Sequence, residues 1–226
     1  MSREEVKKKV GYKAAELVEN NMLVGLGTGS TAFYFIERLI ERSQQGLKVE
    51  VVASSQKTFI QAKQGGLNLL DINKISFLHL TVDGADQIDP KKRIIKGAGG
   101  AHVREKIMAS MSREMLVIID ESKMVKELGK TKVPVEILPF AAKATIHHIE
   151  QAGYRGFLRT NVDQSLYITD NQNYLFDIYF PAFISCPEQE HQKLIQIPGV
   201  IDTGFFFNLA KRVIIGFFDG QIVIKQ

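Results

Sequence analysis

The chain repeats one local order: a short apolar run, then a polar or glycine-rich loop, then apolar residues at helical spacing. Three loops of this kind lie at residues 27–31, 83–86 and 120–123. Strands that alternate with helices predict a mostly parallel sheet covered by helices on both faces. Ligands bind beyond the carboxyl ends of the strands in such sheets, so the polar residues in these loops are candidates for chemistry.

Residues 83–106 hold the densest set of these candidates, because two polar loops occur within this one stretch. The apolar run at 77–82 predicts a strand that ends at Asp83, and residues 93–95 predict a second strand that ends at Lys96. Aspartates, lysines and glycines fill the loops after both strands. Turns that only connect elements have a similar composition, so either loop alone would be weak evidence. Two such loops in one stretch favour a functional site.

Composition limits the class of protein. With 226 residues the chain can form one large domain, or a larger domain and a smaller one, and the second arrangement fits the pattern better. No apolar run approaches the roughly 18 residues of a membrane span, and the first residues do not resemble a signal peptide. Cys186 is the single cysteine, which excludes an internal disulfide and favours a reducing cytoplasm.

The net charge of +4 is small and scattered along the chain. No long basic run with interleaved aromatic residues occurs, which argues against a nucleic-acid partner. A mild positive bias does suit a small anionic substrate.

The order of elements predicts two domains. Ser2 and Glu5 have the spacing of a capping box at the start of a first helix. From residue 133 the pattern changes to strand, helix, strand, strand, helix, strand, with the last strand at 200–207. A final hairpin at 213–225 is expected to rejoin the first domain. The predicted fold is α/β: a Rossmann-like open, mostly parallel sheet in residues 1–130 and about 207–226, and a smaller α+β (ferredoxin-like) domain in 131–206.

The glycine loop at 25–31 precedes a helix and therefore predicts an anion site. Backbone N–H groups and the positive end of the helix attract an anion there, and Ser30 and Thr31 can cap the helix or donate to phosphate. A dinucleotide fingerprint is the alternative, but it fails twice. Ser30 stands where the third glycine belongs, and the next strand ends in Ser54 and Ser55 in place of an acid.

Histidines and aspartates give no convincing metal site. His147 and His148 lie on a predicted helix without a third ligand at useful spacing. The aspartates at 83, 86 and 89 match no calcium loop, and lysines lie nearby. His102 is expected to be a surface histidine without a catalytic role.

In these motifs the chain resembles ribose-5-phosphate isomerases of the type A family. The motifs follow one another in the family's order: G-L-G-T-G-S-T at 25–31, D-G-A-D at 83–86, K-G-A-G-G-A-H-V-R-E-K at 96–106, S-K at 122–123, G-K at 129–130 with P-V-E at 134–136, T-D-N at 169–171, and P-G-V at 198–200. They span nearly the whole chain, and several motifs in register are far more specific than one.

The resemblance implies metal-free interconversion of D-ribose 5-phosphate and D-ribulose 5-phosphate in the pentose phosphate pathway. It implies no cofactor, no nucleic-acid or membrane partner, and a homodimer or homotetramer. Glu105 falls on the family's proton-abstracting glutamate. The resemblance also implies catalytic roles for Asp83, Asp86 and Lys96. Substrate binding is implied for Thr28, Gly29, Ser30, Thr31, Asp83, Gly84, Ala85, Asp86, Lys96, Gly97, Ala98, Gly99 and Lys123.

Two positions depart from the commonest family pattern. Gln87 stands where an acid is usual, and Ala98 interrupts the glycine loop. The chemistry itself needs a base beside the C–H bond that breaks and donors aimed at the oxyanion of an enediolate. Glu105 can supply the base, and Lys96 and the loop amides can supply the donors. Asp83 or Asp86 can hold sugar hydroxyls or assist ring opening, and the sequence does not separate these roles.

Two other functions use similar loops. A sugar-phosphate-sensing module would lack catalysis and usually carries a DNA-binding helix pair, for which no segment is seen before residue 22. An acyl- or CoA-transferase would use a glutamate nucleophile near a glycine loop, with a groove for CoA and ping-pong kinetics.

Overall fold

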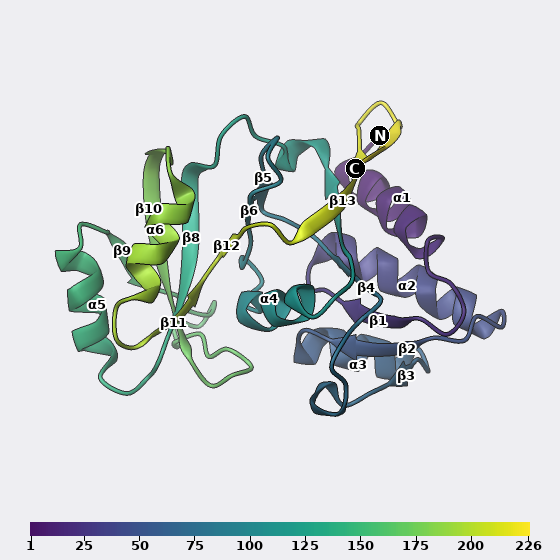
Figure 1. Ribbon diagram of the computed structural model, residues 1–226, viewed down its shortest axis with the longest axis horizontal. Coiled ribbons are helices and arrows are strands. Elements are labelled where there is room, and N and C mark those ends of the chain that lie inside the picture. The colour runs from purple at the N-terminus through teal and green to yellow at the C-terminus, as the bar shows by residue number, and fades with distance from the viewer. The chain divides into compact units, whose positions relative to one another are not determined.

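The computed structural model describes all 226 residues, which form two compact units (Figure 1). The first unit comprises Met1–Ala85, Arg104–Met124 and Asn208–Gln226. The second comprises Asp86–Val103 and Val125–Phe207. The expected domain boundaries at about residues 130 and 207 stay a prediction. The compact units differ from them in that residues 86–103 and 125–130 pack with the second unit.

A seven-stranded sheet forms the centre of the first unit, in the order β14-β13-β7-β4-β1-β2-β3. Every pair of neighbours is parallel except β13 and β14, which form the predicted C-terminal hairpin. In chain order the parallel strands run 3-2-1-4-5-6, the order of a Rossmann fold, which confirms the predicted fold class. The strands are β1 (Leu23–Leu26), β2 (Glu50–Ala53), β3 (Asn68–Leu69), β4 (Leu80–Asp83), β7 (Met115–Asp120), β13 (Ala210–Gly216) and β14 (Ile222–Lys225).

Helices cover both faces of this sheet. They are α1 (Arg3–Ala15), α2 (Ser30–Gln44), α3 (Gln56–Gln64) and α4 (His102–Ser110), with the short 3-10 helices η1 (Ile72–Lys74) and η2 (Glu121–Lys123). The predicted capping box of α1 is confirmed, because the Ser2 hydroxyl accepts from the Glu5 N–H and the Glu5 carboxylate accepts from the Ser2 N–H. A capping residue of this kind stabilises a helix by about 0.5–2 kcal/mol.

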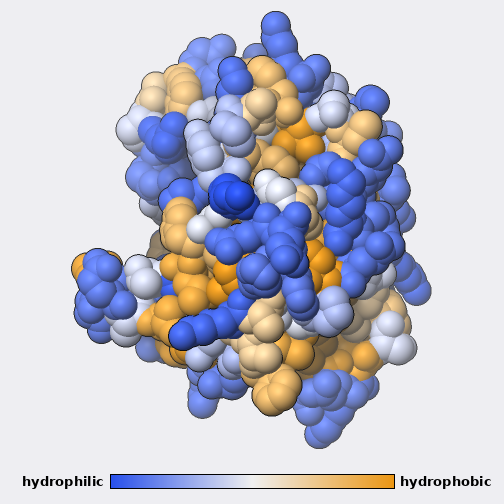
Figure 2. Space-filling view, turned by 90° about the vertical axis from the view of Figure 1, so that its left-hand side faces the viewer, coloured by the Kyte–Doolittle hydropathy of each residue, from blue (hydrophilic) through white to orange (hydrophobic).

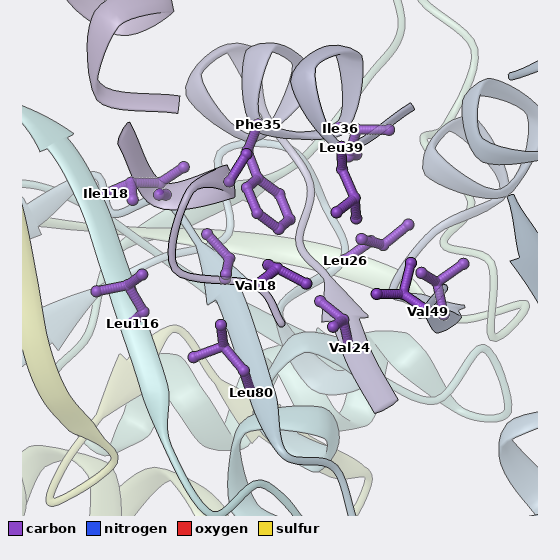
Figure 3. Packing of buried hydrophobic residues seen from close by; sticks show 14 of the residues in the cluster. Val18, Val24, Leu26, Phe35, Ile36, Leu39, Val49, Leu80, Leu116 and Ile118 are labelled. Atoms are coloured by element: carbon purple, nitrogen blue, oxygen red, sulfur yellow. The ribbon is translucent and has the colours of Figure 1, made fainter. Parts of the chain in front are cut away.

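The main core lies between the sheet and helices α1 and α2. Phe35 of α2 is fully buried and belongs to the same cluster as Val24 and Leu26 of β1 (Figure 3). Burial of one such side chain contributes about 1.5–3 kcal/mol. A smaller cluster that includes Met108 of α4 packs on the opposite face. The two layers hold the strands, and therefore the loops at their ends, in fixed positions.

The order of the strands in the sheet reverses between β1 and β4. From β1 the chain continues to β2 on one side, whereas β4 pairs with β1 on the other side, with Leu26 beside Val82. In open α/β sheets, ligands bind beyond the carboxyl ends of the strands at such a switch point. The 27–31 loop and Asp83 both begin here.

The second unit contains a four-stranded antiparallel sheet in the order β11-β8-β10-β9. The elements are β8 (Gly129–Ile137), α5 (Ala142–Gln151), β9 (Gly156–Leu158), β10 (Tyr174–Phe183), α6 (Pro187–Ile195) and β11 (Val200–Thr203). This βαββαβ order, with strands arranged 4-1-3-2, confirms the predicted ferredoxin-like domain. Its core joins sheet residues such as Val135 and Phe176 to Ile149 of α5 and Leu194 of α6.

A three-stranded sheet of β12 (Phe205–Phe206), β6 (Ile94–Ile95) and β5 (Gln87–Ile88) completes the second unit. The prediction of one strand over 200–207 was wrong, because the chain leaves the larger sheet at Gly204 and pairs with β6. Only glycine fits there: a Cβ atom on Gly204 would lie 2.2 Å from the carbonyl oxygen of Lys96. The N–H of Lys96 donates to the Gly204 carbonyl at 2.8 Å.

The surface of the second unit exposes several large apolar side chains among charged ones. Figure 2 shows orange patches between blue ones on the face that carries α5 and α6. Phe140 is 87% exposed, and Phe157 and Phe183 are about half exposed. Lysine ammonium groups lie over two of these rings, Lys132 over Phe157 and Lys130 over Phe183. No helix in either unit is both long enough and apolar enough to cross a membrane.

Candidate active site

The loop between β1 and α2 presents backbone donors at the start of a fifteen-residue helix. Gly29 occupies the N-cap position with a φ of 131°, and no side chain caps the helix. Of the two roles expected for Ser30 and Thr31, capping of α2 was therefore wrong, and donation of a hydroxyl to phosphate stays a prediction. The first turn contains no acidic residue either. The positive end of the helix dipole is thus left uncompensated, which suits an anion such as phosphate.

Thr28 is held by a cluster of hydroxyl groups from the next strand and helix. Its Oγ1 lies 2.7 Å from the Ser54 Oγ and donates to the Ser55 Oγ at 2.8 Å. The Thr58 hydroxyl donates to the Gly27 carbonyl at 3.0 Å. Ser54 and Ser55, which occupy the position of a ribose-binding acid in dinucleotide enzymes, thus fix the loop. No sequence motif indicates this role for Thr58.

Asp83 ends β4 with its carboxylate fully buried. Its Oδ1 accepts from the Gly84 N–H at 2.7 Å and from the Thr28 N–H at 3.2 Å. Gly27 allows this approach, because a Cβ atom there would lie 2.2 Å from the Asp83 Cγ. Two predicted site residues from distant parts of the sequence, Thr28 and Asp83, are therefore in direct contact.

Glu105 lies in the first turn of α4 and is only 3% exposed. A buried carboxyl group in the first helical turn gains from the helix dipole and is shielded from bulk water, two properties of a positioned base. His102, three residues earlier, is fully buried. The expectation of a surface histidine was wrong.

Lys123 closes the 3-10 helix that follows β7, so it belongs to the same carboxyl edge of the sheet. It is half-buried. Asp120 at the end of β7 starts this turn by accepting from the Ser122 N–H at 3.0 Å. The first unit thus places a lysine, a glycine loop and Asp83 after three neighbouring strands.

Gly84 and Ala85 end the first segment of the first unit, and the other predicted site residues, Asp86 and residues 96–99, lie in the second unit. Lys96 follows β6 and is 3% exposed, with its ammonium nitrogen 5.8 Å from the centroid of the Phe206 ring. The Asp86 Oδ2 accepts from the Ala98 N–H at 2.9 Å. This contact joins the D-G-A-D loop to the glycine loop. Ala98 itself is exposed.

Gln87, one of the two departures from the family pattern, bonds to the backbone of Gly129 in both directions. Its side-chain nitrogen donates to the Gly129 carbonyl at 2.9 Å, and its side-chain oxygen accepts from the Gly129 N–H at 3.0 Å. A carboxylate could accept the second bond but could not donate the first. In this chain the position therefore fixes the start of β8.

Asp89 stabilises the turn between β5 and β6. Its carboxylate accepts from the N–H groups of Lys91 and Arg93 and pairs with the Arg93 side chain at 2.6 Å. No group of three or more His, Cys, Asp or Glu side chains in the structure could hold a metal ion.

Known proteins resemble this chain in sequence and in fold. The family model of ribose 5-phosphate isomerase A (phosphoriboisomerase A) matches residues 50–220. A ribose-5-phosphate isomerase A of Protochlamydia amoebophila is 51% identical over 96% of this chain and 94% of that protein. The structure of ribose 5-phosphate isomerase from Plasmodium falciparum is 36% identical, with a TM-score of 0.95 over 99% of this chain and 98% of that one.

A second solved structure is a D-ribose-5-phosphate isomerase in complex with phospho-erythronic acid. It is 35% identical and has a TM-score of 0.93 over the full length of both chains. Both the family model and the near full-length relatives agree with the motifs read from the sequence. The chain therefore belongs to the ribose 5-phosphate isomerase A family.

Proposed function

We propose that this protein is an aldose-ketose isomerase that interconverts D-ribose 5-phosphate and D-ribulose 5-phosphate, in the non-oxidative branch of the pentose phosphate pathway. The observation that carries the proposal is Glu105. It is a buried carboxyl group in the first turn of α4, where the family motif has its glutamate, and it follows the 96–100 loop directly in the chain.

Proton transfer through an enediolate is the mechanism that these side chains support. In the open-chain aldose, the Glu105 carboxylate removes the proton from C2, and the electron pair forms the C1–C2 double bond of the enediolate. The negative charge moves to the carbonyl oxygen at C1. Glu105 then returns the proton to C1, and the proton of the C2 hydroxyl passes to the oxyanion at C1, which leaves the C2 carbonyl and C1 hydroxyl of the ketose. A positioned base contributes about 10²–10⁴ to the rate of such a step.

Lys96 and the N–H groups of Gly97 and Gly99 are proposed as the donors that stabilise the enediolate oxygen, since the Ala98 N–H donates to Asp86. Lys96 is buried, and a charge interaction is stronger where water is excluded. The 27–31 loop, the start of α2 and Lys123 are proposed to bind the 5-phosphate. Backbone N–H groups and one ammonium group are suitable partners for a phosphate.

Asp83 and Asp86 are proposed to bind sugar hydroxyls and to assist ring opening. Asp83 accepts two backbone N–H bonds through Oδ1, and Asp86 uses Oδ2 for Ala98. In each aspartate these hydrogen bonds orient one carboxylate oxygen, and because the carboxylate group is planar they also fix the direction of its second oxygen. Such an oriented carboxylate can bind a hydroxyl group without a large loss of side-chain entropy.

Turnover of ribose 5-phosphate by the purified protein is the direct test. We expect ribulose 5-phosphate to form, and in D₂O we expect some solvent deuterium at C1 of the product, because a carboxylate can exchange its proton. No turnover would exclude the isomerase and leave the sugar-phosphate-sensing module. Ping-pong kinetics with an acyl-CoA would instead identify an acyl- or CoA-transferase.

The assembly and location of the enzyme are also proposals. We propose a homodimer or homotetramer in the cytoplasm. Light scattering coupled to size-exclusion chromatography tests the assembly against the 25.4 kDa mass of one chain.

A further inference from the structure

One arginine of the second unit, Arg159, holds the glycine loop by its carbonyl groups. Its Nη1 donates to the Gly97 carbonyl at 2.9 Å and to the Ala98 carbonyl at 3.1 Å. Arg159 lies 61 positions beyond Ala98 in the sequence, just past the end of β9. None of the motifs includes it.

The rest of the guanidinium group is fixed by Asp177 of β10. The Arg159 Nε donates to Oδ2 of Asp177 at 2.9 Å, and Nη2 pairs with Oδ1. Asp177 is 5% exposed, so this two-point pair is shielded from solvent. The backbone is fixed as well, because the Arg159 N–H donates to the Leu175 carbonyl at 2.8 Å. Arg159 is thus held rigidly, with its Nη1 directed at the loop.

Tyr167 contacts the same loop at its next residues. Its hydroxyl donates to the Gly99 carbonyl at 3.2 Å, and a Cβ atom on Gly100 would lie 2.3 Å from that hydroxyl. The Arg159 guanidinium lies 5.7 Å from the centroid of the Tyr167 ring. Three successive carbonyl groups of the loop, at residues 97, 98 and 99, therefore have side-chain donors.

Fixed carbonyl groups also fix N–H directions. A peptide group is planar and trans, so the N–H of each residue points opposite to the carbonyl of the residue before it. The Gly97 carbonyl thus sets the Ala98 N–H, which donates to Asp86 at 2.9 Å. The Ala98 carbonyl sets the Gly99 N–H in the same way. The Gly99 N–H makes no hydrogen bond within the chain, and Gly99 is exposed.

We propose that Arg159, held by Asp177, is a positioning residue that orients the Gly99 N–H as a donor to the enediolate oxygen. This inference rests on the proposed isomerase function and adds a residue to it. Arg159 acts through the loop and does not touch the substrate. The arrangement keeps the donor ready before the substrate binds, which is the condition for electrostatic stabilisation of a transition state.

The test compares Arg159→Lys with Arg155→Lys. Arg155 is a matched control in the same unit, because its Nη1 also donates to two backbone carbonyls, those of Glu150 and Tyr154, both at 2.9 Å. A lysine cannot keep both the carboxylate pair and the loop contact. We expect Arg159→Lys to lower kcat about 10- to 100-fold with KM changed less than threefold, since a misplacement of about 1 Å can cost 10²-fold. Arg155→Lys should keep the parental kcat.

Loss of Arg159 alone leaves Asp177 buried without its partner, which can unfold the domain. The double variant Arg159→Met with Asp177→Leu removes both charges and replaces them with apolar side chains of similar size. It should fold and show the same fall in kcat. A folded double variant with the parental kcat would overturn the proposal, because the loop contact would then be dispensable.

Binding of two anions separates a local role from a structural one. Phospho-erythronic acid carries a carboxylate at the end opposite its phosphate, whereas inorganic phosphate probes the phosphate site alone. Calorimetry should show about tenfold weaker binding of phospho-erythronic acid to Arg159→Lys and unchanged binding of phosphate. Equal loss for both anions would overturn the proposal in favour of a general structural role. A parent enzyme without turnover would overturn the proposed function, and this inference with it.

Discussion

The two glycine loops of this chain are supported in different ways. The 27–31 loop of the first unit follows β1, and it is fixed by the Asp83 carboxylate and by hydroxyl groups at the start of α3. The 96–100 loop of the second unit follows a strand of only two residues, and it is held by the long side chains of Arg159, just after β9, and Tyr167, before β10. In the seven-stranded sheet, the ends of neighbouring strands position the loop. In the three-stranded sheet, whose strands are only two residues long, side chains from other segments position it.

The difference separates two chemical tasks. The first unit is proposed to hold the base and the phosphate, and the second to hold donors for the enediolate. Changes in the first unit should therefore alter proton transfer or the recognition of phosphate. Changes in the second should alter the stabilisation of charge.

The largest effect is expected for Glu105→Gln. The substitution is nearly isosteric and removes only the ability to accept a proton, so kcat/KM should fall by about 10²–10⁴ while the fold is retained. Steady-state kinetics and a thermal melt measure the two properties. Comparable kcat/KM for variant and parent would show that Glu105 is not the catalytic base.

Lys123→Ala should have the next largest effect. A charge-assisted hydrogen bond to phosphate is worth about 1.5–3 kcal/mol, which predicts a loss of about ten- to a hundred-fold in kcat/KM on ribose 5-phosphate. The loss should depend on the phosphate, so free ribose serves as the control substrate. An equal loss on both substrates would mean that Lys123 acts at the reacting carbons or supports the fold.

Gly27→Ala tests the packing of the first loop. The new methyl group would lie 2.2 Å from the Asp83 Cγ, so either the loop or the aspartate must move. Overpacking of this kind costs about 1–3 kcal/mol. The control is Gly84→Ala, whose Cβ would have only the Ile118 carbonyl nearby, at 3.8 Å. Urea unfolding should show a lower midpoint for Gly27→Ala than for Gly84→Ala, and equal midpoints would contradict the proposed fit.

Gln87→Glu should have the smallest effect and belongs to the second unit. The carboxylate would lose the hydrogen bond to the Gly129 carbonyl, at a cost of about 0.5–1.5 kcal/mol. Exposed Gln192 on α6 offers a control with the same change in charge. Chemical unfolding of both variants gives the difference. If Gln87→Glu is as stable as Gln192→Glu, the two-way contact contributes nothing measurable.

What the sequence could predict follows from the range of the interactions. The capping box of Ser2 and Glu5 and the strand that ends at Asp83 depend on neighbours in the chain, and both were predicted. Burial of His102 and the hydroxyl cluster at Thr58 depend on residues brought together by the sheet, and neither was. Arg159 reaches back across 62 positions to Gly97, and the register of β9 against β10 sets that contact. No local period or spacing encodes it.

The path of the chain between the units has a consequence for biosynthesis. The chain passes from one unit to the other four times, and residues 208–226 return last to complete the first unit. β13 pairs with β7 inside the seven-stranded sheet, so this edge of β7 has no partner until the ribosome has made residues 210–216. β7 is buried along its entire length in the finished protein. An apolar strand with an open edge is a site of aggregation, so the nascent chain is most vulnerable between the synthesis of β7 and that of β13.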